Sequence, residues 1–279
     1  MLKKRLIFTL LLHQGTFQLS RNFSLQGVGN LDWLQKYYDF TAIEHSVDEL
    51  VLLNVTRGEK RMPLFCDRIA QLSLTAFMPI SAGGGVRTID DAYRLLDAGA
   101  DKLVVNNSIF STPEFVEELA KRFGSQCVVA SLDYRGSGER AEVYTDAGKV
   151  RAGMNMKEAV LRTQEVGGGE LYLTSIDRDG TGQGYDLETL ELASSMCRLP
   201  IIASGGVGDF EHLLQGLRLA NVTGASTANI FNFMGDGLTR ARGHIEARGV
   251  PLAHWVFGDP AGQTPTSTTT SSDPLREPS

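Results

Sequence analysis

The stretch Pro79-Ile-Ser-Ala-Gly-Gly-Gly-Val86 returns 121 residues later as Pro200-Ile-Ile-Ala-Ser-Gly-Gly-Val207. The same offset relates Glu49-Leu-Val-Leu to Glu170-Leu-Tyr-Leu. Each repeated stretch contains a short apolar run, and the two repeats occur in the same order in both halves of the chain. Each half therefore carries the same succession of elements. This internal repeat predicts two similar halves within one fold.

Short apolar runs alternate with segments of helical periodicity along most of the chain. Eight of these runs are predicted strands: Arg5–Leu12, Glu49–Val55, Met78–Ser81, Lys102–Val105, Gln126–Leu132, Glu170–Ser175, Pro200–Ala203 and Thr223–Ala228. The predicted helices include Thr88–Ala98, Pro113–Phe123, Asn155–Val166, Asp186–Met196 and Asp209–Leu219. Buried strands that alternate with helices indicate a parallel sheet covered by helices. Four strands per half would leave open sheet edges if each half folded alone, so we predict a single α/β domain, a (β/α)8 (TIM) barrel.

Length and charge limit the possible functions. The 279 residues include 27 Lys+Arg and 33 Asp+Glu, which gives a net charge of −6 and argues against a nucleic acid as partner. Residues 258–279 contain 13 Ser, Thr or Pro among 22, and we expect this segment to be a disordered tail behind a barrel over residues 1–257. The three cysteines are widely spaced and predict neither a metal site nor a disulfide.

The N-terminus resembles a short signal peptide because three basic residues precede the apolar run Leu6–Leu12. The run has only seven residues and no small-residue cleavage pattern follows it. A buried first strand explains it better, and a span of the bilayer would need about 20 apolar residues. We therefore expect a cytoplasmic protein without a membrane contact.

Glycines follow two of the repeated strands, at Gly83–Gly85 and Gly205–Gly206. Glycines at the carboxyl end of a strand let backbone N–H groups approach a phosphate. The strand after each glycine segment ends in small residues, which are Asn106, Asn107, Ala228 and Asn229. Two matching cradles on opposite sides of one barrel face predict a small-molecule ligand with a phosphate at each end.

Aspartates supply possible acid and base groups at the same face. Asp133 ends one predicted strand, and Asp177 and Asp179 follow another. The ends of barrel strands are where catalytic residues of such folds lie. Each of these aspartates could instead cap a helix, but together they form a plausible acid/base set.

The sequence resembles the cyclase subunit of imidazole glycerol phosphate synthase from about Met1 to Pro251. The motifs that carry the resemblance are Lys4-Arg5, Asn22-Phe23, Asp48-Glu49-Leu50, Gly83-Gly-Gly-Val-Arg87, Phe123-Gly-Ser-Gln-Cys-Val-Val129, Leu173-Thr-Ser-Ile-Asp-Arg-Asp-Gly-Thr181 and Ala203-Ser-Gly-Gly206. The resemblance implies a barrel that binds a bisphosphate at its carboxyl-terminal face and requires no cofactor. It also implies a glutaminase partner, docked at the opposite face in a heterodimer, whose ammonia passes through the barrel.

The resemblance assigns roles to individual residues. It implies a salt-bridge ring at the ammonia entrance, made of Arg5, Glu49, Lys102 and Glu170, and it places Asp101 near the partner. It implies phosphate contacts at Gly85, Asn106, Asn107, Asp179, Gly180, Gly206, Ala228 and Asn229. Of the two catalytic aspartates of the family, only Asp133 is present.

Leu11 stands where the family has its first catalytic aspartate, and Asn54 replaces another aspartate at the end of the second strand. Leucine cannot transfer a proton, so we expect the family's cyclisation to be severely impaired. This combination resembles a divergent branch of the family that is associated with acetamidino sugars of bacterial surface polysaccharides. The alternatives are an ordinary cyclase of histidine biosynthesis, a free-standing isomerase of the related phosphoribosyl-imidazole type, and a non-catalytic phosphate-binding barrel. The ordinary cyclase would convert the phosphoribulosyl-formimino-AICAR phosphate and ammonia to imidazole glycerol phosphate and AICAR.

Overall fold

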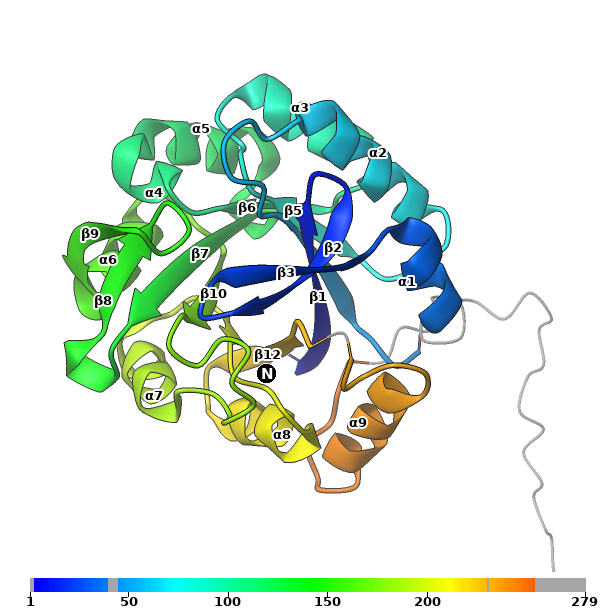
Figure 1. Ribbon diagram of the computed structural model, residues 1–279. Coiled ribbons are helices and arrows are strands. Elements are labelled where there is room, and N and C mark those ends of the chain that lie inside the picture. The colour runs from blue at the N-terminus through cyan, green and yellow to red at the C-terminus, as the bar shows by residue number, and fades with distance from the viewer. Residues whose placement is uncertain (1–2, 40–44, 230, 254–279) are drawn as a thin grey trace, which may run out of the picture.

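Eight parallel strands close into a barrel in the computed structural model, which describes residues 3–39, 45–229 and 231–253. In order around the barrel they are β1 (Arg5–His13), β4 (Glu49–Asn54), β5 (Ile80–Gly83), β6 (Lys102–Val105), β7 (Val128–Arg135), β10 (Glu170–Ser175), β11 (Ile201–Ser204) and β12 (Val222–Thr227). β1 pairs with β4 on one side and with β12 on the other, and β7 pairs with β10, so the described barrel strands leave no open edge. The predicted (β/α)8 barrel is confirmed (Figure 1).

Helices surround the barrel and connect its strands (Figure 1). They are α1 (Leu31–Tyr37), α2 (Met62–Ser73), α3 (Ile89–Asp97), α4 (Ser108–Ser111), α5 (Pro113–Phe123), α6 (Met156–Glu165), α7 (Leu187–Met196), α8 (Phe210–Arg218) and α9 (Gly237–Glu246). Several begin at side chains that cap them. Thr88 and Asp91 form a capping box at α3, and Pro113 occupies the first turn of α5, where its missing N–H costs nothing.

Alternation along β1 divides its side chains between two cores. Leu6, Phe8, Leu10 and Leu12 belong to the large core between barrel and helices. Ile7 belongs instead to a separate, smaller cluster inside the barrel. Because successive strand residues point to opposite faces, Arg5, Thr9 and Leu11 share the inner side with Ile7. The inner residues of β1 therefore form a column from one end of the barrel to the other.

Two antiparallel hairpins extend the strands beyond the carboxyl-terminal mouth of the barrel. One consists of β2 (Thr16–Arg21) and β3 (Ser24–Gly29), and the other of β8 (Glu142–Thr145) and β9 (Val150–Asn155). β2 continues from β1, with Leu12 paired to Phe17. Figure 1 shows the β2–β3 hairpin lying across the opening of the barrel. Neither hairpin was expected from the alternation of strands and helices.

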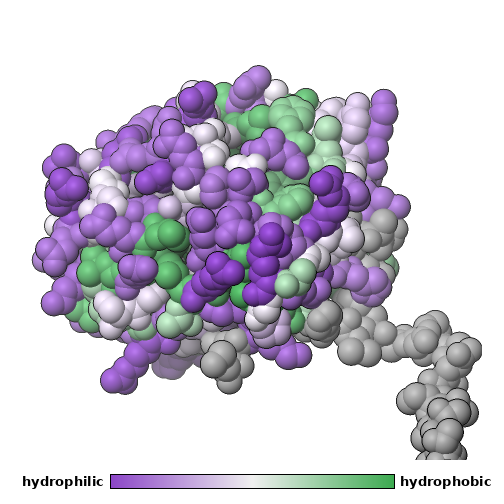
Figure 2. All heavy atoms as spheres, turned by 90° about the horizontal axis from the view of Figure 1, so that it is seen from below, coloured by the Kyte–Doolittle hydropathy of each residue, from purple (hydrophilic) through white to green (hydrophobic). Residues whose placement is uncertain are grey.

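No helix in the described part of the chain combines the length and apolarity that crossing a bilayer requires. The side of the barrel seen in Figure 2 is mostly hydrophilic, with separate apolar patches. Cys66, Cys127 and Cys197 are free thiols, the last two buried. The predicted tail, 258–279, lies outside the described residues.

Candidate functional site

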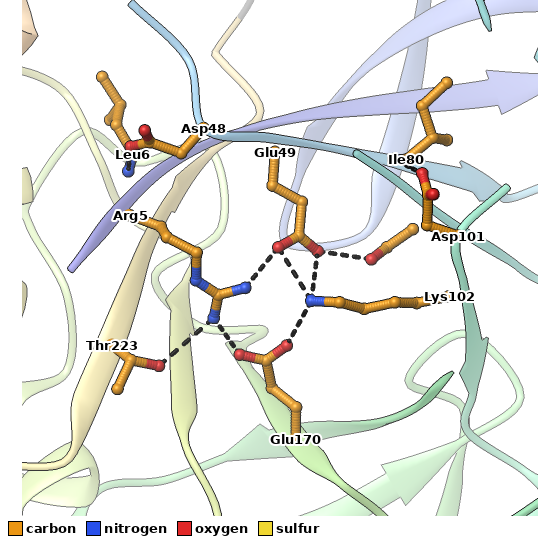
Figure 3. A network of polar contacts seen from close by, with 10 residues as sticks. Arg5, Leu6, Asp48, Glu49, Ile80, Asp101, Lys102, Glu170 and Thr223 are labelled. Atoms are coloured by element: carbon orange, nitrogen blue, oxygen red, sulfur yellow. Dashed lines mark hydrogen bonds and ion pairs between the residues drawn. The ribbon is translucent and has the colours of Figure 1, made fainter. Parts of the chain in front are cut away.

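Four charged side chains close the amino-terminal end of the barrel (Figure 3). Arg5 donates to Glu49 and to Glu170, and the Lys102 Nζ lies 3.1 Å from Glu49 Oε2 and 3.0 Å from Glu170 Oε2. Each cation therefore bridges both anions. The hydroxyl of Ser81 donates to Glu49 Oε1 at 2.5 Å and adds a neutral member to the ring. The structure thus brings together all four residues of the expected ring.

The ring is only slightly open to solvent. The side chains of Glu49 and Glu170 are 2% and 8% exposed, and those of Arg5 and Lys102 are 15% and 21% exposed. Burial works against the charged guanidinium, but the nearby carboxylates outweigh it and raise the pKa of Arg5 above its usual value. The ring pairs two basic with two acidic side chains, so its formal charges cancel in sum. Removing any one would leave an unpaired charge at a half-buried site.

Above the ring, the inside of the barrel changes from apolar to hydroxyl-rich. Ile7, Val51, Val104, Val129 and Ile202 pack in the inner cluster together with Tyr172. The phenol of Tyr172 lies 2.8 Å from Thr9 Oγ1 and 3.0 Å from both Ser204 Oγ and Ser226 Oγ. These buried groups are uncharged and satisfy one another. A neutral molecule would meet no ionised side chain among them.

Asp133 lies at the inner, carboxyl-terminal end of β7. Its Oδ2 accepts a hydrogen bond from Asn106 Nδ2 at 3.1 Å, and the same amide donates to Ser131 O at 3.0 Å. Burial raises the pKa of Asp133 to about 7, the negative charge of Asp179 adds to the rise, and the bond from Asn106 opposes it. A carboxyl group poised near neutral pH can serve as acid or base. Asp133 thus lies two residues before the end of β7, and its chemical role stays a prediction.

Leu11 occupies the corresponding inner position at the end of β1. Its side chain is 8% exposed, and it pairs with Leu53 of β4 and with Gln18 of the hairpin. An apolar side chain fits this place without disturbing the strand. On the inner side of β1, no residue beyond Arg5 is ionisable until His13 is reached. β1 thus supplies no carboxylate to partner Asp133.

The two glycine cradles lie on opposite pairs of neighbouring strands. Gly85 follows β5, beside Asn106 and Asn107 after β6, while Gly206 follows β11, beside the residues after β12. Both glycines have φ above +100°, a region that other residues rarely adopt. A Cβ on Gly206 would lie 2.1 Å from Gly184 O, so a side chain would clash with the backbone. Ala228 and Asn229 are half-buried at the second cradle.

Asp179, which the resemblance assigned to phosphate binding together with Gly180, is hydrogen-bonded to the β2–β3 hairpin. The Asp179 carboxylate accepts from Ser20 Oγ at 2.5 Å and from Phe23 N at 3.0 Å, and its own N–H donates to Ser175 O at 3.0 Å. Its backbone donor is therefore occupied, and its charge would repel a phosphate. In this structure Asp179 fastens the β2–β3 hairpin, which leaves the N–H of Gly180 as the donor that could reach a phosphate there.

Comparisons with known proteins agree with this geometry. A family model described as "Histidine biosynthesis protein" matches residues 32–236. An imidazole glycerol phosphate synthase subunit HisF from Gluconacetobacter diazotrophicus (strain ATCC 49037) is 39% identical over 256 residues, which cover 91% of this chain and 97% of that protein. The chain belongs to the family of imidazole glycerol phosphate synthase cyclase subunits. Another member, from Parasynechococcus marenigrum (strain WH8102), carries the provisional name imidazole glycerol phosphate synthase subunit hisF2 and is 37% identical over 256 residues, 91% of this chain and 95% of that protein.

Some site residues escaped the sequence reasoning. Ser81 contacts the ring and Lys60 lies against the first cradle. Ser81 lies within the repeated stretch, but that stretch did not predict its contact with the ring, and Lys60 belongs to no motif that the sequence analysis singled out. The turn from β1 to β2 did leave a signal in the sequence, because Gln14-Gly15 is a two-residue link between β-rich segments, and both residues adopt positive φ. Among the described residues, no three or more His, Cys, Asp or Glu side chains come together in a group that could hold a metal ion.

Proposed function

We propose that this chain is the synthase half of a glutamine-dependent complex, in which a glutaminase partner releases ammonia at the Arg5–Glu49–Lys102–Glu170 ring. The ammonia then passes inside the barrel toward the phosphate-binding face. The ring is the observation that supports this proposal best. Buried ion networks contribute little to stability compared with apolar packing, so four charges at one barrel end suit a functional entrance better than a structural plug.

The inner surface suits the neutral form of ammonia. An ammonium ion that entered the apolar layer around Val51 and Val129 would lose its hydration without gaining a counter-ion. Neutral ammonia avoids most of that cost, and the hydroxyls around Tyr172 can accept its N–H groups. The chemistry of the passage therefore favours NH3 over its conjugate acid.

Leu11 sets the proposed acceptor apart from that of an ordinary cyclase. The family's ring closure uses two carboxylates, and loss of a general acid or base typically lowers the rate about 10²–10⁴-fold. We infer that the ammonia serves the amidation of a surface-polysaccharide sugar by a separate enzyme. The ordinary histidine cyclase is the second candidate, because Asp133 keeps a pKa near 7 and a relative named HisF is 39% identical.

The amino-terminal face offers a place for the partner. A hollow of about 330 Å³ is lined by Phe77, Met78, Pro79 and Asp101, next to Lys102 of the ring. Phe77 and the nearby Leu74 are 55% and 78% exposed. Asp101 holds the edge of this hollow through a bond from Ile80 N at 2.8 Å. Exposed apolar side chains beside the entrance are what a docked glutaminase would cover.

Co-purification with the glutaminase encoded in the same genome tests the proposal. We expect a stable one-to-one complex, and Phe77→Asp should weaken it at least tenfold because a charge would enter an apolar contact. Leu161→Asp is the control, since Leu161 is 43% exposed on α6, along the side of the barrel. Absence of a complex with the unaltered chain, or equal loss in both variants, would contradict the proposed partner.

Complementation of a histidine auxotroph that lacks the cyclase separates the two candidate acceptors. We expect the unaltered chain to support little or no growth, and Leu11→Asp to improve it by restoring the missing carboxylate. The Leu11→Asn variant is the control, because it adds polarity without an ionisable group. Full growth with the unaltered chain would establish the ordinary cyclase and refute the divergent acceptor.

A further inference from the structure

Lys60 lies directly against the first phosphate cradle. A Cβ built on Gly85 would stand 2.7 Å from Lys60 Cγ, so the lysine stem runs over the glycine that opens the cradle. The ammonium group donates to Asn54 O at 3.1 Å. That carbonyl in turn lies 2.3 Å from where a Cβ of Gly84 would be. The charged end of Lys60 is thus held beside the Gly84–Gly85 backbone.

The positive charge of Lys60 has no anionic partner within ion-pair distance among the residues that the structure describes. Asn54, the nearest side chain at the end of β4, is neutral, and its amide donates to Lys60 O at 2.6 Å. Burial lowers the pKa of Lys60, the positive charge of Arg87 lowers it further, and Asp146 opposes both. A half-buried ammonium that contacts only a carbonyl gains free energy from any anion that enters beside it.

The neighbours of Lys60 place it on the ligand side of the cradle. Arg87 follows Gly85 in the same loop, and the N–H of Asp146 donates to Asn107 Oδ1 at 3.3 Å. The charges of Arg87, in the Gly85 loop, and of Asp146, beside Asn107, both act on Lys60. Lys60 therefore lies next to the space between Gly85 and Asn107. At the second cradle the cation near Gly206 is Arg178, whose guanidinium donates to Gln183 O at 3.4 Å.

We propose that Lys60 is a phosphate-binding residue of the first cradle, and that it makes this cradle the stronger site for a dianionic phosphate of the ligand. The inference rests on the proposed phosphate-binding face. Entry of the phosphate replaces the bond from the ammonium to the neutral carbonyl of Asn54 with a bond between two opposite charges. The glycine N–H groups fix the position of the phosphate, and Lys60 supplies the charge that the glycines lack.

Titration of the isotope-labelled full chain with inorganic phosphate tests this role. The amide resonances of Gly85 and Gly206 report the two cradles separately. We expect Lys60→Gln to raise the dissociation constant seen at Gly85 about tenfold and to leave the constant seen at Gly206 unchanged, because one charge-assisted bond is lost. Lys60→Arg should keep most of the affinity, because it keeps the positive charge. The melting temperatures of both Lys60 variants show whether each variant still folds.

Lys121→Gln is the matched control, since Lys121 is an exposed lysine on α5. An unchanged constant at Gly85 in Lys60→Gln, or an equal loss at Gly206 or in Lys121→Gln, would overturn the role of Lys60 while leaving the phosphate face intact. No response to phosphate at either glycine in the unaltered chain would instead overturn the phosphate face, and this inference with it.

Discussion

At the scale of single residues, the buried carboxyl group of Asp133 lowers the stability of the folded protein at neutral and alkaline pH. Its pKa of about 7 in the folded chain lies well above the usual value of an unfolded aspartate, because burial and Asp179 disfavour its charge. The folded state therefore binds more protons between about pH 4 and pH 7, and stability falls as the pH rises through that window. We expect Asp133→Asn to stabilise the chain by roughly 2–3 kcal/mol more at pH 8 than at pH 5. Urea unfolding at both pH values measures the difference, and the exposed Asp97→Asn serves as control; equal shifts at both pH values would contradict the buried charge.

At the scale of elements, the β2–β3 hairpin is held across the barrel mouth by hydrogen bonds from Ser20, Asn22 and Phe23 to residues 176–179. Its tip residue Phe23 has φ of 65°, which is unfavourable for a side chain of this size. The conformation persists because Phe23 N donates to Asp179, while Arg57 donates to Phe23 O at 2.6 Å. We expect Asp179→Ala to release the tip and to speed amide exchange in residues 16–29 at least tenfold, with little effect on the barrel strands. Asp177→Ala is the control, because its carboxylate bonds to Arg135 instead; unchanged exchange in Asp179→Ala would show that other contacts hold the hairpin.

At the scale of the whole molecule, the closed barrel separates two faces with different chemistry. The ring at the amino-terminal end is balanced in charge and nearly sealed, whereas the other end gathers Asp133, both cradles and the hairpins. Parallel strands produce this polarity, since all eight present their carboxyl ends at the same mouth. Under the proposed function, ammonia that entered at the ring would be kept apart from bulk water until it reached the proposed phosphate-binding face. A net charge of −6 leaves that face cationic only locally, around Lys60 and Arg87.

The strand and helix pattern was predictable because each element is encoded locally. β6 and β10 have the predicted bounds, and the remaining predicted strands differ at their ends by no more than three residues. The repeat also predicted which strands would be opposite each other, and so placed the two cradles. The hairpins were missed because β2 and β3 lie outside the two-fold repeat and because their pairing depends on the tight turn at Asn22-Phe23 rather than on an apolar run.

The sequence by itself determined the barrel, because strand alternation and the internal repeat are encoded locally. Its resemblance to the cyclase family indicated the four members of the ring and the missing carboxylate at Leu11. Only the tertiary structure decided how charges and hydrogen bonds are shared. It joined Arg5 and Lys102 to both glutamates and tied Asp179 to the hairpin. It also placed Lys60 against Gly85, with no counter-ion among the residues that the structure describes. These outcomes depend on distances between loops far apart in the chain. Side-chain packing sets such distances, and no local pattern encodes them.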